Sequence, residues 1–172
     1  TVLGQQDEDD INTVELDDAI SADLSFLKQA EDNGTVFKYD GEAKPALDIF
    51  RNHGYNWIRL RLFHSPDKLP NDLEYTIALA KAAKKRGYKF LLDYHYADSW
   101  ADPGKQPIPG AWKGLDAETL TDSVFAYTRN TIRAFRKAGV MPEMVQIGNE
   151  IRNGMLWPLG KLPDHWNNLA SF

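Results

Sequence analysis

Four short apolar segments recur along the chain, and a segment with helical periodicity separates each from the next. The predicted strands cover residues 20–25, 56–62, 89–93 and 144–149. Strands that alternate with helices favour a parallel sheet, because parallel neighbours need a long crossover connection between them. The first two intervals between the starts of successive strands are close to the value of about 31 residues that is expected when about 250 residues divide among eight βα units. The sequence therefore predicts an α/β fold.

Helix start and stop signals support this pattern. Pro45 suits the first turn of a helix that runs to Asn52. Asn71 is predicted to cap a helix over residues 73–86, with Glu74 as its capping-box partner. Asp116 is predicted to cap a helix over residues 117–138, and another helix begins within residues 163–172.

The strand ends favour half of a (β/α)8 TIM barrel over a doubly wound sheet. Polar residues gather at the strand ends, whereas no glycine-rich phosphate loop follows a strand. Residues 19–172 are therefore predicted to form the N-terminal half of a barrel domain that is truncated at its C-terminus. Residues 1–18 are acidic, have few large apolar groups and are predicted to form a disordered leader.

Composition excludes several classes of function. The net charge of -5 argues against nucleic-acid and acidic-membrane partners. The chain has no cysteine, its four histidines lack the spacing of metal ligands, and no Gly-x-Ser-x-Gly elbow occurs. We therefore predict no metal and no cofactor, which leaves chemistry based on carboxylates.

The segment over residues 144–150 is the most informative. An apolar strand ends in Gly148, Asn149 and Glu150, which places a carboxylic acid where a general acid could reach a bound substrate. The alternative is a surface salt bridge between Glu150 and Arg152. Neighbouring strand residues point to opposite faces, so Asn149 and Glu150 share a site only if the strand twists or bulges there.

Two other clusters carry polar chemistry. Residues 93–103 combine aromatic rings with aspartates and His95, a mixture suited to sugar faces and hydroxyls, although a polar turn over core aromatics is an equal alternative. On the second strand, Arg59 and Arg61 point to the same side. They are predicted either to keep a catalytic carboxylate ionised or to pair structurally with Asp23 or Asp93.

These blocks together resemble glycoside hydrolase family 53. The matching segments are residues 22–25, 58–62, 93–103, 145–152 and 156–158, in family order. The resemblance implies a (β/α)8 barrel that hydrolyses internal β-1,4-galactosidic bonds of galactan or type I arabinogalactan with retention. The stretch over residues 63–65 departs from the usual tryptophan-containing continuation, which we expect to alter a subsite.

The resemblance also implies residue roles. Glu150 corresponds to the acid/base, Asn149 precedes it, and Arg59 supports the nucleophile. The implied substrate-binding residues are His95, Asp98, Trp100, Asp23, Ser25 and Trp157. The family's nucleophile is a Glu near the end of strand seven, to which no residue here corresponds, so the 172 residues alone are expected to be inactive.

Two alternatives remain at this point. One is another β-1,4-glycanase of the same clan, such as a cellulase or mannanase. The other is a carbohydrate-binding protein without turnover. The expected partner is a polysaccharide, β-1,4-galactan, and a polymeric substrate implies a secreted or periplasmic location.

Overall fold

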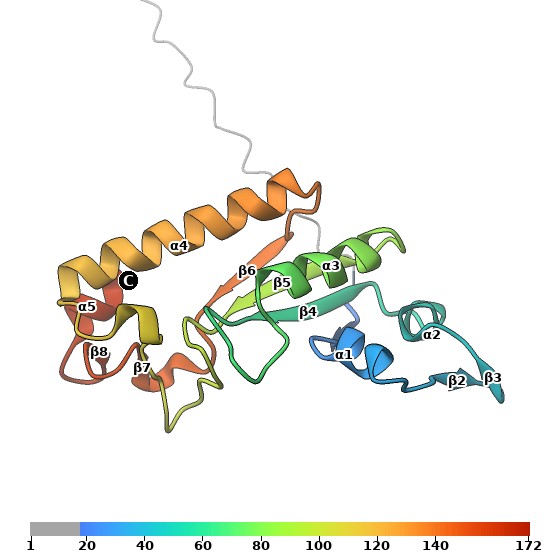
Figure 1. Ribbon diagram of the computed structural model, residues 1–172, viewed down its shortest axis with the longest axis horizontal. Helices are drawn as coiled ribbons and strands as arrows, with labels where there is room; N and C mark the ends of the chain where they lie inside the picture. Colours follow the sequence, from blue (N-terminus) through green and yellow to red (C-terminus); the bar gives the residue numbers. More distant parts are fainter. Residues whose placement is uncertain (1–17) are drawn as a thin grey trace, which may run out of the picture.

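The computed structural model describes residues 18–172, and Figure 1 shows the order of its elements. One sheet contains, in spatial and chain order, β1 (Ser21–Asp23), β4 (Trp57–Leu62), β5 (Lys89–Tyr94) and β6 (Met144–Ile147). The helices are α1 (Leu27–Asp32), α2 (Ala46–Asn52), α3 (Leu73–Lys84), α4 (Ala117–Lys137) and α5 (Trp166–Ser171). All three strand pairings in this sheet are parallel, which confirms the predicted alternation. The predicted leader lies outside the described residues, except for Asp18.

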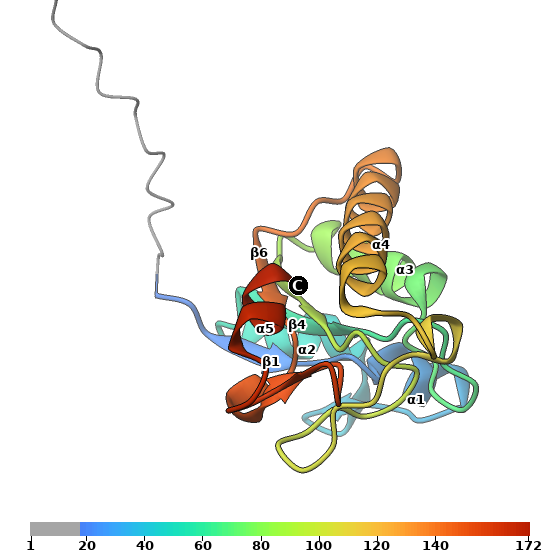
Figure 2. The ribbon, with the colours of Figure 1, turned by 90° about the vertical axis from the view of Figure 1, so that its left-hand side faces the viewer.

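Helices α3 and α4 lie on the same side of the sheet, as both views show (Figures 1 and 2). Alternate strand residues, including Leu60 and Leu92, are completely buried and join one hydrophobic core with Leu79 of α3 and Leu120 of α4. Complete burial of one such side chain contributes about 1.5–3 kcal/mol relative to exposure. This apolar layer lies on the face of the sheet that α3 and α4 cover.

The core also satisfies its buried hydroxyl groups. Tyr94 is the last residue of β5, and Tyr96 lies two residues beyond it. The Tyr94 hydroxyl lies 2.6 Å from Thr131 Oγ1, and the Tyr96 hydroxyl lies 2.8 Å from Thr128 Oγ1. Burial raises the pKa of both tyrosines above the ordinary value, so these hydroxyls stay protonated. The pairs fix α4 against the end of β5.

The structure corrects one predicted helix cap. Asp72, not Asn71, caps α3, and its side chain accepts a hydrogen bond from the Tyr75 N–H. Asn71 is buried, and its Nδ2 donates to the Ser25 carbonyl at 2.7 Å. The shift by one residue puts Glu74 at the second helical position, where it cannot form the predicted capping box. At α4 the predicted Asp116 cap is confirmed.

The longer connections contain elements that periodicity did not reveal. These are α1, the antiparallel pair β2 (Lys38–Tyr39) and β3 (Glu42–Ala43), and a second pair, β7 (Gly154–Met155) and β8 (Gly160–Lys161). Each strand of these pairs has only two residues, which is too short for a period-two pattern. None of the described helices combines the length and apolar composition needed to cross a bilayer.

Candidate active site

Strand register gathers five charged or polar side chains on the face away from α3 and α4. Asp23 lies opposite Arg59, while Arg61 lies opposite Asp93, which in turn lies opposite Gln146. Register partners in a parallel sheet point the same way, and residues two apart on one strand share a face. The sheet therefore presents a polar surface across all four of its strands.

Arg59 is the centre of this surface. Its Nη1 donates to Asp23 Oδ2 at 2.8 Å, and its Nη2 donates to Asp93 Oδ2 at 2.6 Å and to Asn149 Oδ1 at 2.8 Å. Arg61 Nη2 lies 2.8 Å from the same Asp23 oxygen. Since Asp93 is completely buried, its charge would be costly without a paired cation. Of the two predicted roles, the structure shows the structural pairing, of Arg59 with Asp23 and Asp93 and of Arg61 with Asp23.

Asp23 and Ser25 form the next part of the network. The Ser25 hydroxyl donates to Asp23 Oδ1 at 2.6 Å and accepts from the Arg61 N–H at 2.9 Å. Burial alone would raise the pKa of Asp23, but hydrogen bonds from Ser25 and Arg59 and the charge of Arg61 together lower it. Asp23 is therefore an anion that holds both arginines in place. Ser25 is buried and acts through Asp23.

The chain leaves β6 by a turn that brings Asn149 and Glu150 to one side. Strand β6 ends at Ile147, two residues earlier than predicted. Gly148 has φ +77°, and a Cβ there would lie 2.5 Å from Ile151 Cγ2, so a larger residue would clash. Glu150 is itself in the left-handed region, with φ 52°. Asn149 and Glu150 thus lie beyond the strand, and a turn brings them to one side where the sequence predicted a twist or bulge within the strand.

A cavity of about 520 Å³ opens above the polar surface. Eight residues line it: Arg59, Arg61, Trp100, Ala101, Asp102, Gln146, Asn149 and Glu150. They combine an aromatic ring, two guanidinium groups, two amides and two carboxylates. This mixture suits a polyhydroxylated ligand, whose C–H faces contact rings and whose hydroxyls bond to polar groups.

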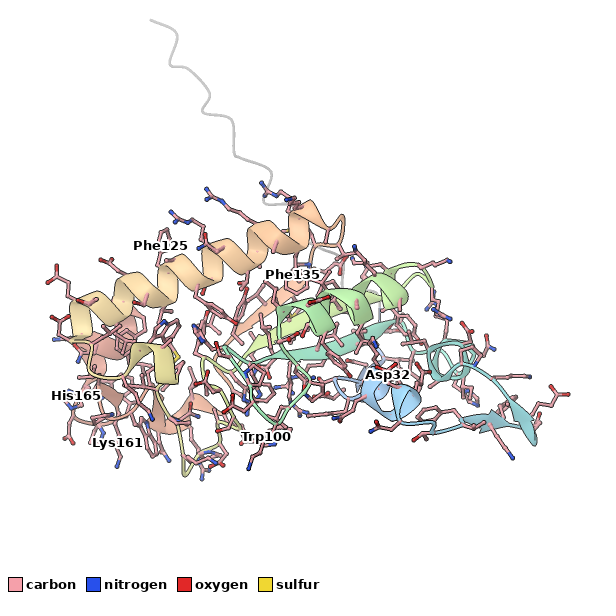
Figure 3. All side chains as sticks on the ribbon, in the orientation of Figure 1. Asp32, Trp100, Phe125, Phe135, Lys161 and His165 are labelled. Atoms are coloured by element: carbon pink, nitrogen blue, oxygen red, sulfur yellow. The ribbon has the colours of Figure 1, made fainter. Side chains whose placement is uncertain are left out.

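Trp100 forms an exposed wall of the cavity. Its side chain is 40% exposed, stacks on Phe26 with ring centroids 5.7 Å apart, and lies 4.9 Å from the Arg61 guanidinium carbon. Figure 3 places Trp100 on the side of the molecule away from Phe125 of α4. Contacts from two elements fix the ring, yet they leave part of it open to a ligand.

His95 lies beneath the cavity and not in its wall. Its side chain is completely buried, its Nε2 lies 3.3 Å from Asp93 Oδ2, and its Nδ1 accepts from the Ala101 N–H at 3.3 Å. The ring therefore contacts the anion that pairs with Arg59. The ring does not line the cavity in this structure, and the Ala101 N–H and the Trp100 ring lie against it.

Asp98 is also not brought to the cavity wall. Its two carboxylate oxygens accept hydrogen bonds from the Ser65 N–H at 2.9 Å and the Gly110 N–H at 2.7 Å. These bonds tie together the loops that follow β4 and β5. In this structure Asp98 therefore affects the site indirectly, by fixing the backbone of these two loops.

Trp157 pairs with the loop after β5 through its backbone. Its backbone N–H donates to the Gln106 carbonyl at 2.7 Å, and its Nε1 donates to the Asn153 carbonyl at 3.0 Å. It is not among the residues that line the cavity. Trp157 therefore holds the segment after Glu150 against the loop after β5.

Gln146 is a lining residue that our sequence reasoning did not select. Its Nε2 donates to the Gly148 carbonyl at 3.0 Å, and its Oε1 lies 3.5 Å from Arg59 Nη2. A signal was present, because Gln146 is a polar residue inside an otherwise apolar strand. Asp102, another lining residue, was noted only as part of the segment over residues 93–103.

Of the two carboxyl groups that line the cavity, Asp102 is half-buried and accepts a hydrogen bond from the Gly104 N–H, which leaves Glu150 as the more accessible group for acid–base chemistry. Glu150 is exposed, and the arginines beside it are balanced by Asp23 and Asp93. Among residues 18–172, no group of three or more acidic or histidine side chains is arranged to hold a metal ion. Proton transfer by Glu150 is the chemistry that this geometry supports.

Similar proteins of known structure share this fold. A structure of fungal β-1,4-galactanases matches with a TM-score of 0.84 and 37% identity over 88% of this chain and 45% of that chain. The catalytic domain of a family 53 glycoside hydrolase from Ignisphaera aggregans matches with a TM-score of 0.83 and 35% identity, over 88% of this chain and 44% of that chain. The described strands and helices therefore correspond to part of a (β/α)8 barrel, as predicted.

Named enzymes from two fungi are also similar to this chain in sequence. An arabinogalactan endo-β-1,4-galactanase A from Emericella nidulans is 42% identical over 150 residues, which are 87% of this chain and 43% of the relative. A probable enzyme of the same name from Aspergillus terreus is 43% identical over 150 residues, with the same two shares. The chain thus spans less than half the length of these relatives. The family model for glycosyl hydrolase family 53 matches residues 19–172, and the chain belongs to that family.

Proposed function

We propose that the protein containing this chain is a retaining endo-β-1,4-galactanase that hydrolyses galactan or type I arabinogalactan. One observation carries this proposal: the exposed Glu150 lines a polar and aromatic cavity beside Asn149, which Arg59 holds. The names of the related enzymes from Emericella nidulans and Aspergillus terreus support the substrate.

Glu150 is assigned two successive proton transfers. Retaining hydrolysis needs two carboxyl groups about 5–5.5 Å apart. The carboxylic acid of Glu150 gives its proton to the glycosidic oxygen as the C1–O bond breaks and a second carboxylate bonds to C1. The Glu150 carboxylate then takes a proton from water, whose oxygen bonds to C1 as the enzyme–C1 bond breaks.

The second carboxylate is assigned to a Glu outside these 172 residues, following the family resemblance. Arg59 is assigned to support that nucleophile, because its guanidinium lines the cavity. We therefore expect the 172-residue chain alone to release no new reducing ends from galactan.

Substrate binding is assigned to two kinds of residue. Trp100 offers its open ring surface to a sugar, and Asn149 lines the same cavity. The others, Asp23, Ser25, His95, Asp98 and Trp157, support these groups from beneath or from the loops. Because galactan is a polymer, we propose that the protein acts outside the cytoplasm.

The test compares Glu150→Gln with the unchanged full-length protein on galactan, mannan and cellulose. The unchanged protein should cleave galactan, whereas Glu150→Gln should bind it and release about 10²–10⁴-fold fewer reducing ends per unit time. Glu42→Gln is the matched control, since the Glu42 side chain is 76% exposed on the β2–β3 hairpin. Cleavage confined to mannan or cellulose would reject the substrate, and binding without cleavage would favour a carbohydrate-binding protein.

A further inference from the structure

We propose that Gln106 is a positioning residue that sets the location of the Glu150 carboxyl group. This inference rests on the proposed function for the catalytic consequence, although its structural part can be tested without turnover. Gln106 lies in the loop after β5 and is 2% exposed. It does not line the cavity.

The side-chain amide of Gln106 faces three backbone carbonyl groups. Its Nε2 donates to Asn149 O at 2.8 Å and to Asp102 O at 3.1 Å, and lies 3.4 Å from Glu150 O. Two N–H groups are therefore shared among three acceptors. The backbone carbonyl of Gln106 accepts from the Trp157 N–H at 2.7 Å, which holds the residue itself in place.

The turn after β6 needs such a donor. Strand pairing ends at Ile147, so the carbonyls of Asn149 and Glu150 have no partner in the strand ladder. The left-handed backbone of Glu150, with φ 52°, is unfavourable for a residue with a side chain. Hydrogen bonds from a buried amide favour this conformation over alternatives that would leave the carbonyls unpaired.

The location of the carboxyl group depends on that backbone. A change in the backbone angles of Glu150 would move its carboxyl group, and proton transfer requires that group to lie within hydrogen-bond distance of the glycosidic oxygen. Arg59 holds the Asn149 side chain, whereas Gln106 holds the carbonyls of both residues. The two contacts therefore act on different atoms of the same turn.

The first experiment uses Gln106→Met in the full-length enzyme. This variant keeps the side-chain length and removes the donor. We expect kcat on galactan to fall roughly 10²-fold with little change in KM, because misplacement by about 1 Å has that effect. First-turnover release of nitrophenolate from a nitrophenyl β-galactobioside should change little, since this leaving group departs without a proton.

A structural role alone predicts a different result, because both substrates would then lose activity equally. In the Glu150→Gln background, Gln106→Met should cause no further loss on galactan. An additional loss there, or equal losses on both substrates, overturns the inference. Lys105→Met is the matched control, since Lys105 is the exposed neighbour in the same loop.

Amide hydrogen exchange over residues 148–152 provides a readout that is independent of turnover. Exchange should become faster in Gln106→Met and stay unchanged in Lys105→Met. If the unchanged protein cleaves no galactan but exchange is faster in Gln106→Met, the positioning role is upheld and the proposed function is rejected. Unchanged exchange overturns the inference. If Gln106→Met does not fold, Gln106→Asn, which keeps the amide but withdraws it by one methylene, is tested with the same expectations.

Discussion

Nη2 of Arg59 donates a hydrogen bond to Oδ1 of Asn149 at 2.8 Å, which joins the second strand of the sheet to the residue before Glu150. The other end of the Asn149 amide is also held, because its Nδ2 donates to Ala101 O at 2.7 Å. The orientation of the turn after β6 therefore depends on β4 and on the loop after β5.

Replacing Arg59 should destabilise the protein. Arg59→Met leaves the completely buried Asp93 without its cation. Removal of one partner from a buried ion pair costs about 3–5 kcal/mol, and because the Arg59 side chain is 22% exposed we expect about 3 kcal/mol. Urea denaturation measures the free energy of unfolding. Arg133→Met, at an exposed position of α4, should change it by less than about 0.5 kcal/mol; similar values for both variants would contradict the expectation.

Acid should weaken the contribution of Asp23. Its pKa is lowered in the folded state from an ordinary value of 3.8. A lowered folded pKa stabilises the protein above the unfolded value, and this contribution is lost as pH falls from about 3.8 through the folded value. We expect the difference in unfolding free energy between the unchanged protein and Asp23→Asn to be constant at pH 5–7 and to shrink below about pH 4. A difference independent of pH would refute this.

Titration of His64 should change the stability of the protein at higher pH than titration of Asp23 does. Burial lowers its pKa from the ordinary 6.5, although the nearby Asp98 carboxylate opposes this. Its ring packs on Trp112 and Tyr127, with centroids 4.5 and 4.6 Å away. Its contribution to stability is complete above pH 6.5 and is lost as pH falls through 6.5 toward the folded pKa.

The His64 expectation is checked by NMR titration of the histidine rings, with His64→Gln to assign the signal. The assigned ring should titrate below pH 6.5. His64→Gln should also reduce the loss of unfolding free energy between about pH 7 and pH 5. A midpoint above the ordinary value would show that the Asp98 charge outweighs burial.

Removing the Trp100 ring should weaken binding of galacto-oligosaccharides. The ring is 40% exposed at the cavity wall, and its loss removes apolar surface that a sugar would cover. We expect Trp100→Ala, in the Glu150→Gln background, to raise the Kd of galactotetraose about tenfold, or about 1.4 kcal/mol. Calorimetry measures this, with Trp166→Ala as a control because Trp166 is 62% exposed outside the cavity. An equal rise in Kd from Trp100→Ala and Trp166→Ala would contradict a specific contact between the Trp100 ring and the sugar.

Much of the scaffold could be predicted from the sequence because its signals are local. The apolar strand runs and the Asp116 cap predicted elements that the structure contains. Alternation along β4 also placed Arg59 and Arg61 on one face, which register then joined to Asp93. Such patterns depend on a few neighbouring residues.

The parts that could not be predicted depend on contacts between distant segments. Both Asn71 and Asp72 are good helix caps, and the choice between them is decided by the Ser25 carbonyl, which Asn71 binds. His95 lies in a segment whose composition suits a sugar site. Its ring is nevertheless buried, with Trp100 and the Ala101 N–H against it. The role of Asp98 depends on backbone N–H groups of residues 65 and 110.

The strands lie side by side in the order in which a ribosome makes them. Within this sheet each newly synthesised strand therefore pairs with a strand that was made before it. Arg59 emerges before Asp93, so the carboxylate that becomes most deeply enclosed meets its guanidinium as soon as β5 docks. The two arginines of β4 and Asp23 of β1 leave one positive charge unbalanced, and the Asp93 carboxylate balances it when β5 docks.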